Sequence, residues 1–117
     1  MALLLPLSAA SCRKGGQVDA SPDVIRQITM KKWAIEPRRI EVPEGDEVEL
    51  VVTSTDIEHG IAVPGLGIRE PVQPGRPTVV RFRAKTPGAY AMSCSVLCGK
   101  DHDQMTGEIV VSPRQPR

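Results

Sequence analysis

Residues 94–105 of the chain read "CSVLCGKDHDQM" and place two thiols, an imidazole and a thioether at spacings of four, four and three residues. Each of these side chains can donate an electron pair to a metal ion. Thiolate, imidazole and thioether together are a soft set of donors, which selects copper, whereas zinc sites seldom use a thioether. The pattern therefore indicates a copper site that is built largely from one segment of the chain.

Two other interpretations of this segment compete with the metal site. Positions 94, 98, 102 and 105 fall on one face of a helix, but the segment contains Gly99 and several charged residues, which disfavour a stable amphipathic helix. A Cys94–Cys98 disulfide is compatible with an exported protein, because that compartment is oxidising. It would leave His102 and Met105 without a role. A loop that binds metal gives all four side chains a common purpose.

A remaining ligand must come from elsewhere in the chain, and His59 is the only other histidine. It lies in "STDIEHGIAVPG", directly after a predicted strand at 47–54, where a loop is expected to begin. A lone histidine after a strand is more often structural or simply exposed. Its combination with the motif at 94–105 makes it the predicted partner ligand.

The composition indicates what kind of fold must hold these residues. The chain has 117 residues, of which 40% are hydrophobic, and this suffices for one domain. Eleven prolines and ten glycines along the sequence disfavour long helices. The formal charge is +1 and no long basic run is present, so the sequence gives no indication of nucleic-acid binding.

Short strands are predicted from the alternation of apolar and polar residues. In "EVELVVTS", residues 47–54, Val48, Leu50 and Val52 alternate with Glu47 and Glu49, which is the period of a half-buried strand. Similar runs occupy 25–35, 38–42, 78–84, 87–93 and 107–112. Six or seven short strands without a convincing helix predict an all-β protein, namely a β-sandwich.

The two ends of the sequence lie outside the predicted domain. Residues 1–12, "MALLLPLSAASC", have the order of an export signal, and "AASC" resembles the lipobox of bacterial lipoproteins, which implies lipidation of Cys12. Residues 13–22 are predicted to be a flexible tether, because they offer almost nothing to bury. The domain is expected at 23–113, followed by a polar tail at 114–117.

The segment 94–105, taken together with "TSTDIEHGIAVPGLGI", "PGRPTVVRFRAKTPGAYAMSC" and "GEIVVS", resembles the CuA domain of cytochrome c oxidase subunit II. The resemblance runs from about 29 to 112 and carries the signature C-x3-C-x3-H-x2-M with an upstream histidine. It implies a cupredoxin-like Greek-key β-sandwich of about seven strands. Type I blue-copper cupredoxins share this fold but use one cysteine, so the second thiol distinguishes the two classes.

The resemblance also implies a dinuclear copper centre. Cys94 and Cys98 would bridge two copper ions through their thiolates. The side chains of His59 and Met105 would complete one copper. The side chain of His102 and the backbone carbonyl of Val96 would complete the other.

Position 96 is glutamate in many oxidase subunits, where its side chain also helps to hold magnesium or manganese at the subunit interface. Val96 has no carboxylate, so neither of these metals is expected here, and no haem is expected either. All copper ligand positions would be filled, which leaves no site for a substrate. The domain is thus predicted to relay electrons, as the electron-entry subunit of a cytochrome c oxidase would, and not to be catalytic by itself.

The expected partners are a cytochrome c or another redox protein, an oxidase catalytic subunit, and a copper chaperone that loads the site. An apolar rim in "AVPGLGI" and nearby carboxylates would form the docking surface for a basic partner, although an ordinary solvated loop explains them as well. The predicted docking residues are Glu58, Ala62, Val63, Pro64, Leu66, Asp101 and Asp103.

Two alternatives to an electron relay remain at this point. One is a periplasmic cupredoxin that stores copper or delivers it to an oxidase. The other is a redox-sensing or structural domain in which Cys94 and Cys98 form a disulfide and bind no metal. In each case the protein is expected on the periplasmic side of the membrane, either anchored by a lipid on Cys12 or as a free-standing carrier.

Overall fold

A computed structural model of the chain describes residues 21–95 and 104–114. This part consists of nine strands and one short 3-10 helix. In chain order they are β1 (Val24–Lys31), β2 (Ala34–Glu36), β3 (Arg39–Pro43), β4 (Glu47–Ser54), β5 (His59–Val63), η1 (Pro64–Leu66), β6 (Ile68–Val72), β7 (Thr78–Arg83), β8 (Gly88–Cys94) and β9 (Thr106–Ser112).

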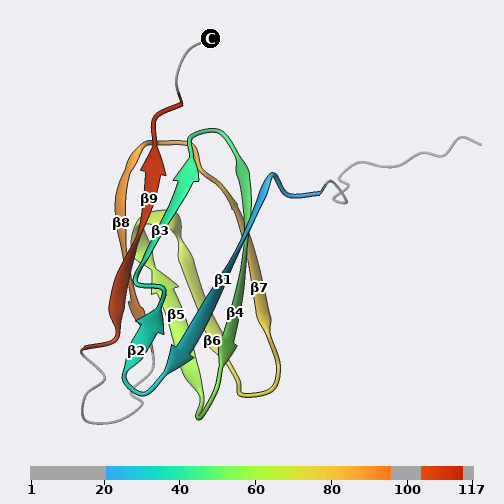
Figure 1. Cartoon of the computed structure of the whole chain (residues 1–117), viewed down its shortest axis with the longest axis vertical. Coiled ribbons are helices and arrows are strands. Elements are labelled where there is room, and N and C mark those ends of the chain that lie inside the picture. The colour runs from blue at the N-terminus through green and yellow to red at the C-terminus, as the bar shows by residue number, and fades with distance from the viewer. Residues whose placement is uncertain (1–20, 96–103, 115–117) are drawn as a thin grey trace, which may run out of the picture.

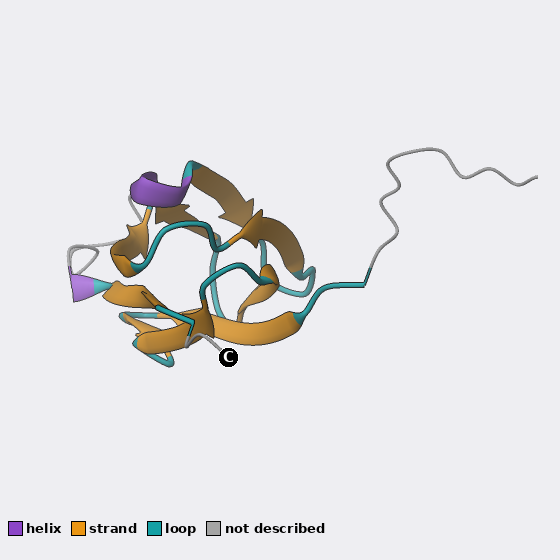
Figure 2. Ribbon diagram, turned by 90° about the horizontal axis from the view of Figure 1, so that it is seen from above, coloured by secondary structure: helices purple, strands orange, loops and turns teal. Residues whose placement is uncertain are grey.

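The strands form two sheets that face each other as a sandwich (Figures 1 and 2). The four-stranded sheet has the order β2-β1-β4-β7, and the five-stranded sheet has the order β3-β9-β8-β5-β6. Each sheet contains one parallel pair, β1 with β4 and β3 with β9, while the remaining neighbours run antiparallel. This architecture confirms the predicted all-β, cupredoxin-like sandwich.

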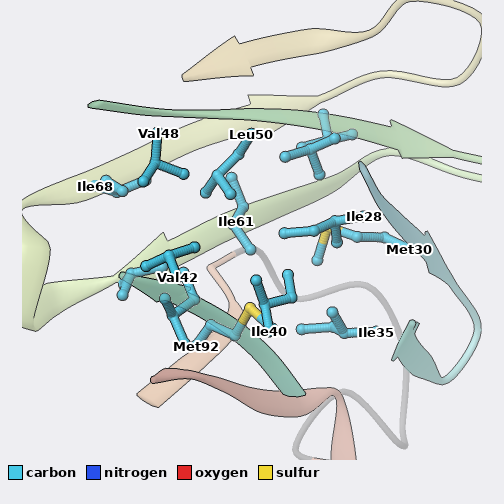
Figure 3. Packing of buried hydrophobic residues seen from close by; sticks show 14 of the residues in the cluster. Ile28, Met30, Ile35, Ile40, Val42, Val48, Leu50, Ile61, Ile68 and Met92 are labelled. Carbon is cyan, nitrogen blue, oxygen red and sulfur yellow. The ribbon is translucent and has the colours of Figure 1, made fainter. Parts of the chain in front are cut away.

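Strand β4 shows why the alternating pattern is a reliable signal. Val48, Leu50 and Val52 are fully buried, whereas Glu47 and Glu49 are partly exposed on the outer face. Residues of both sheets meet the inward face of β4 in one continuous apolar core, in which Leu50 of β4 and Ile61 of β5 lie close together (Figure 3). Burial of these aliphatic side chains supplies the main driving force for closing the sandwich.

Four strands depart from the predicted arrangement. The run at 25–35 is divided into β1 and β2 by a turn at Lys32 and Trp33, and β2 folds back antiparallel on β1. The Gly/Pro-rich stretch after His59 contains β5 and β6, an antiparallel hairpin connected by η1. At the end of η1, Gly67 has a φ of 69°, a left-handed conformation that glycine adopts without a steric penalty.

One end of the sandwich gathers the termini of several strands. Strands β1, β4 and β8 end there, while β2, β5 and β9 begin there (Figure 1). We call it the His59 end, after the first residue of β5. Within the described residues, no helix has the length and apolar character needed to cross a membrane.

Candidate metal centre

Strand register brings two of the predicted ligands together. Ile61 of β5 lies directly opposite Cys94 of β8, and a hydrogen bond from the Ser95 amide to the Gly60 carbonyl, 2.9 Å long, continues this pairing. His59 is two residues before Ile61 and shares its face, because side chains alternate along a strand. His59 and Cys94 are therefore diagonal neighbours on the inner face of the five-stranded sheet.

The side chains of these two residues face each other inside the protein. His59 has no exposed surface and Cys94 is only 5% exposed. The distance between Cys94 Sγ and His59 Nδ1 is 3.9 Å. Residues that are 35 positions apart in sequence thus present a sulfur and a ring nitrogen to the same small volume.

Asp56 holds the far side of the histidine ring. Its Oδ1 lies 2.8 Å from His59 Nε2 and also accepts a hydrogen bond of 2.6 Å from the Ile57 amide. Its Oδ2 accepts a 2.8 Å hydrogen bond from the Lys32 amide. One carboxylate therefore joins the turn after β1 to the turn before β5 and fixes the orientation of the ring.

The charge state of Asp56 determines what the ring can do. Burial alone would raise the pKa of this carboxyl, but hydrogen bonds from the Lys32 and Ile57 amides and the contact with His59 outweigh it and lower the pKa from 3.8 to about 2. An ionised carboxylate only accepts hydrogen bonds, so Nε2 of the ring must be the donor. In the neutral ring Nδ1 then keeps its lone pair, which faces Cys94 Sγ. This arrangement fits a metal-ligating histidine with an outer carboxylate.

The turn before β5 is built by a serine at the end of β4. Ser54 is 6% exposed, and its hydroxyl donates to the Ile57 carbonyl and accepts from the Asp56 amide. Short polar side chains stabilise turns in this way by bonding to nearby backbone groups. The sequence "STD" therefore positions both Asp56 and the histidine that follows it.

Met105 is the third predicted ligand within the described residues. It is fully buried and directly precedes β9, whose first residue, Thr106, lies opposite Ser93. Because Ser93 neighbours Cys94, the thioether belongs to the same end of the sandwich as the thiol. Sulfur, imidazole nitrogen and thioether are thus all supplied at the His59 end, and this soft donor set suits copper.

Several predicted residues lie outside the described part of the chain, and their positions stay predictions. They are Cys12, Val96, Cys98, Asp101, His102 and Asp103. Within residues 21–95 and 104–114, no group of three or more His, Cys, Asp or Glu side chains is arranged to hold a metal ion. A complete site would therefore require ligands from the segment between Ser95 and Gln104.

The predicted apolar docking rim is not formed by Ala62 and Val63. Ala62 is 4% exposed and Val63 is fully buried, because both belong to strand β5. Pro64 and Leu66 belong to η1, at the opposite end of β5 from His59. Glu58 is exposed next to His59 and is the described docking residue that remains available at this end.

Asp56 is a functional residue that the sequence patterns did not single out. Its role depends on a turn that brings a carboxylate back to the ring of a residue three positions later. A signal was present, because "STD" before a histidine is rich in residues that bond to their own turn. Recognising Asp56 as a partner of His59 would have required interpreting the "STD" turn and the histidine that follows it as one structural motif.

Comparison with known proteins places this fold in a family. Residues 20–113 match the sequence profile described as cytochrome c oxidase subunit II, periplasmic domain. The chain is 43% identical over 79 residues to cytochrome c oxidase subunit 2 of Thermus thermophilus, which covers 68% of this chain and 58% of that relative. A second subunit 2 sequence from the same species is also 43% identical, over 47% of its length. The chain thus spans about half the length of these curated relatives.

Solved structures show the same relationship. The periplasmic domain of subunit II of cytochrome oxidase from Bradyrhizobium japonicum superposes with a TM-score of 0.73 at 27% identity, over 80% of this chain and 87% of that one. A mixed disulfide intermediate between the thioredoxin-like TlpAs and subunit II of cytochrome c oxidase gives a TM-score of 0.68 at 26% identity, over 83% and 87% of the two chains. The chain belongs to the cytochrome c oxidase subunit II family, in the part that forms its periplasmic domain.

Proposed function

We propose that the chain relays electrons through a dinuclear CuA copper centre. Cys94 and Cys98 would bridge the two copper ions. The first ion would also be held by His59 and Met105. The second would be held by His102 and the backbone carbonyl of Val96.

The observation that carries this proposal is the placement of His59 against Cys94. Two buried donors from different strands lie 3.9 Å apart, with the outer ring nitrogen bound by Asp56 and a buried thioether at the same end of the fold. A histidine that served only to fill the core would not need its inner nitrogen turned towards a thiol. Membership of the subunit II family supports the same assignment.

The surrounding fold suits electron transfer better than catalysis. When bound, a copper pair with shared thiolates accepts and releases one electron while each metal–ligand bond changes little. His59 and Cys94 are fixed on paired strands, and Asp56 restrains the ring further. A rigid ligand frame keeps rearrangement small, and small rearrangement permits fast transfer at low driving force.

The partners and location are also part of the proposal, and membership of the family supports an oxidase partner and the periplasmic side. The donor would be a cytochrome c-like protein and the acceptor a terminal oxidase or another reductase. The domain would work on the periplasmic side, loaded by a copper chaperone and anchored by a lipid on Cys12. Because Val96 lacks a carboxylate, no magnesium or manganese would be bound beside the copper.

Electron paramagnetic resonance of the copper-loaded chain tests this function. A hyperfine pattern of seven lines, which means one unpaired electron shared by two coppers, is expected. Cys98→Ser should abolish this pattern, because it removes a bridge. Met105→Leu is the matched control, and it should keep the pair and shift its reduction potential. A four-line spectrum in the unsubstituted chain, or a seven-line spectrum in Cys98→Ser, would contradict the proposal.

The second candidate function is periplasmic copper delivery, which the buried soft donors permit equally well. A delivery protein would be colourless, would hold Cu(I), and would surrender it to a partner. Reversible redox cycling with retention of both coppers would exclude delivery. Mass spectrometry under non-reducing, copper-replete conditions addresses the metal-free alternative, since a mass two protons lower and no copper would indicate a Cys94–Cys98 disulfide.

A further inference from the structure

The outer face of the four-stranded sheet carries exposed apolar side chains. Among the residues that the structure describes, the two exposed large hydrophobic side chains are Ile25, 52% exposed, and Val79, 57% exposed. Both project from this face, Ile25 from β1 and Val79 from β7. Val51 of β4 lies half-buried between them, because β4 pairs with both strands (Figure 1). Apolar side chains that gather on one face and are bordered by polar groups are typical of an interaction surface.

Two cross-strand ion pairs border this apolar stripe. Glu49 Oε1 of β4 lies 3.1 Å from Arg81 Nε of β7, and Glu47 Oε1 lies 3.2 Å from the guanidinium of Arg83. Strand β4 therefore presents a column of two carboxylates beside a column of two guanidinium groups on β7. The four charges sum to zero, so that two such surfaces are not kept apart by the net charge of these columns.

The other charges on this face lie towards its ends. At one end the Asp23 carboxylate accepts a 2.8 Å hydrogen bond from the Glu47 amide. At the other end Lys31 lies 3.3 Å from Glu36. The apolar stripe is thus bordered most closely by the columns of β4 and β7.

The register between β4 and β7 makes these columns self-complementary. The opposed residues are Glu47 with Arg83, Glu49 with Arg81, and Val51 with Val79. A two-fold axis that runs along the strands, midway between β4 and β7, would place β4 of each copy over β7 of the other at the same height. Each carboxylate column would then face a guanidinium column, and the two valines would face each other.

We propose that two copies of the chain associate through this face, about that two-fold axis. Arg81 of each copy would face Glu49 of the other, and Val79 would meet Val51 of the other. No like charges of the two columns are opposed, which is the condition for electrostatic complementarity. The same patch would be used by both copies, as in an isologous dimer. Two sheets packed face to face about 10 Å apart have the ordinary geometry of a β-sandwich.

The size of the face indicates a weak and reversible contact. Three strands about 4.8 Å apart, each contributing seven residues of about 3.3 Å, cover roughly 320 Å². Stable complexes bury about 800 Å² on each partner. Association is therefore expected at protein concentrations of roughly 0.1–1 mM.

The orientation of the axis has a consequence for the metal centre. Because the axis runs along the strands, both copies point in the same direction. The two His59 ends would lie at one end of the pair, and the first residues of both β1 strands would lie at the other. The contact leaves the His59 end uncovered, so this inference goes beyond the proposed relay and does not depend on it.

Sedimentation velocity of the full chain tests the association. The weight-average sedimentation coefficient should rise towards that of a dimer between about 0.01 and 1 mM. Glu49→Arg would oppose two guanidinium groups across the axis, and Arg81→Glu would oppose two carboxylates. Each variant alone should weaken association at least about tenfold.

An equimolar mixture of these two variants gives the sharpest result. The introduced arginine of one variant would face the introduced glutamate of the other, so the mixture should associate although neither variant does so alone. Glu70→Arg is the matched control, because it makes the same charge change at an exposed position of β6 in the other sheet. It should leave the association unchanged.

Circular dichroism checks that each variant is folded. Val79→Lys provides a second test if a charge variant does not fold, since position 79 is exposed and the substitution should weaken association without disturbing the core. A monomer at 1 mM, undiminished association in both charge variants, a mixture that stays monomeric, or equal weakening by Glu70→Arg would each overturn the proposal. None of these measurements depends on copper, so their failure leaves the relay untouched.

Discussion

Strands β4 and β5 both have a neighbouring strand on each side, yet the burial of their residues follows different patterns. Along β4, buried and partly exposed residues alternate strictly, whereas all five residues of β5 are buried. Strand β4 contributes apolar side chains to the core on one face and carries solvated glutamates on the other. Strand β5 is enclosed on both faces and begins with His59. The comparison teaches that the strand carrying the proposed chemistry is the one whose pattern is least typical of an antiparallel sheet.

The largest expected effect comes from breaking the inward face of β4. Leu50→Ala should lower the free energy of unfolding by about 2–5 kcal/mol, because it removes a fully buried side chain and leaves a cavity. Chemical denaturation of the metal-free and copper-loaded chains measures this effect. We expect the same loss in both, since Leu50 is not among the proposed ligands. A loss confined to the copper-loaded form would show that the framework and the metal site are not separable.

A smaller effect with a different signature is expected from the turn that precedes β5. Asp56→Ala should lower copper affinity about tenfold or more, as loss of an outer partner of a ligating histidine commonly does. Asp56→Asn is the matched control, since its side-chain oxygen can still accept a hydrogen bond from the ring. Competition with a copper chelator measures both. Equal affinity in Asp56→Ala and the unsubstituted chain would mean that the carboxylate does not position His59.

The same carboxylate predicts how the metal-free fold responds to acid. The pKa of Asp56 lies near 2 in the folded chain, below its ordinary value of 3.8, so the ionised form is favoured by folding. Its contribution to stability is complete above about pH 4 and is lost as the pH falls through about 2. Denaturation midpoints between about pH 5 and pH 2 should therefore decline less steeply in Asp56→Asn. Identical slopes in the two chains would contradict this assignment.

The smallest expected effect is on the outer face of β4. Glu47→Gln removes an ion pair whose atoms lie 3.2 Å apart and whose arginine, Arg83, is 53% exposed. Exposed pairs contribute at most about 1 kcal/mol, so thermal unfolding should shift only slightly. A loss comparable to that of Leu50→Ala would overturn the distinction between the two faces of this strand.

The sequence was sufficient to predict a strand wherever one face of that strand is exposed to solvent. The alternation in β4, and that of Val80 and Phe82 with the arginines of β7, correctly indicated strands with an inward face. Strand β5 was missed because burial on both sides removes the alternation. The Gly/Pro-rich hairpin was therefore interpreted as a loop, and Ala62 and Val63 were wrongly assigned to an exposed rim.

The candidate site was partly predictable for a chemical reason. His59, Cys94 and Met105 were recognisable because their side chains are metal donors, and the structure places them at one end of the sandwich. Asp56 was not recognised, since carboxylates are common on any surface. Its importance depends on a ring nitrogen that lies 2.8 Å away. This relationship cannot be read from the order of residues.

The register between β5 and β8 has a mechanical consequence. Within the described residues, this junction comprises two register pairs, Ile61 with Cys94 and Ala62 with Ser93, whereas β8 and β9 share six. The five-stranded sheet therefore consists of two parts, β3-β9-β8 and β5-β6, which are paired over a short length. His59 belongs to one part and Cys94 to the other. A metal bound between these two residues would link the two parts through side chains, where backbone pairing is limited.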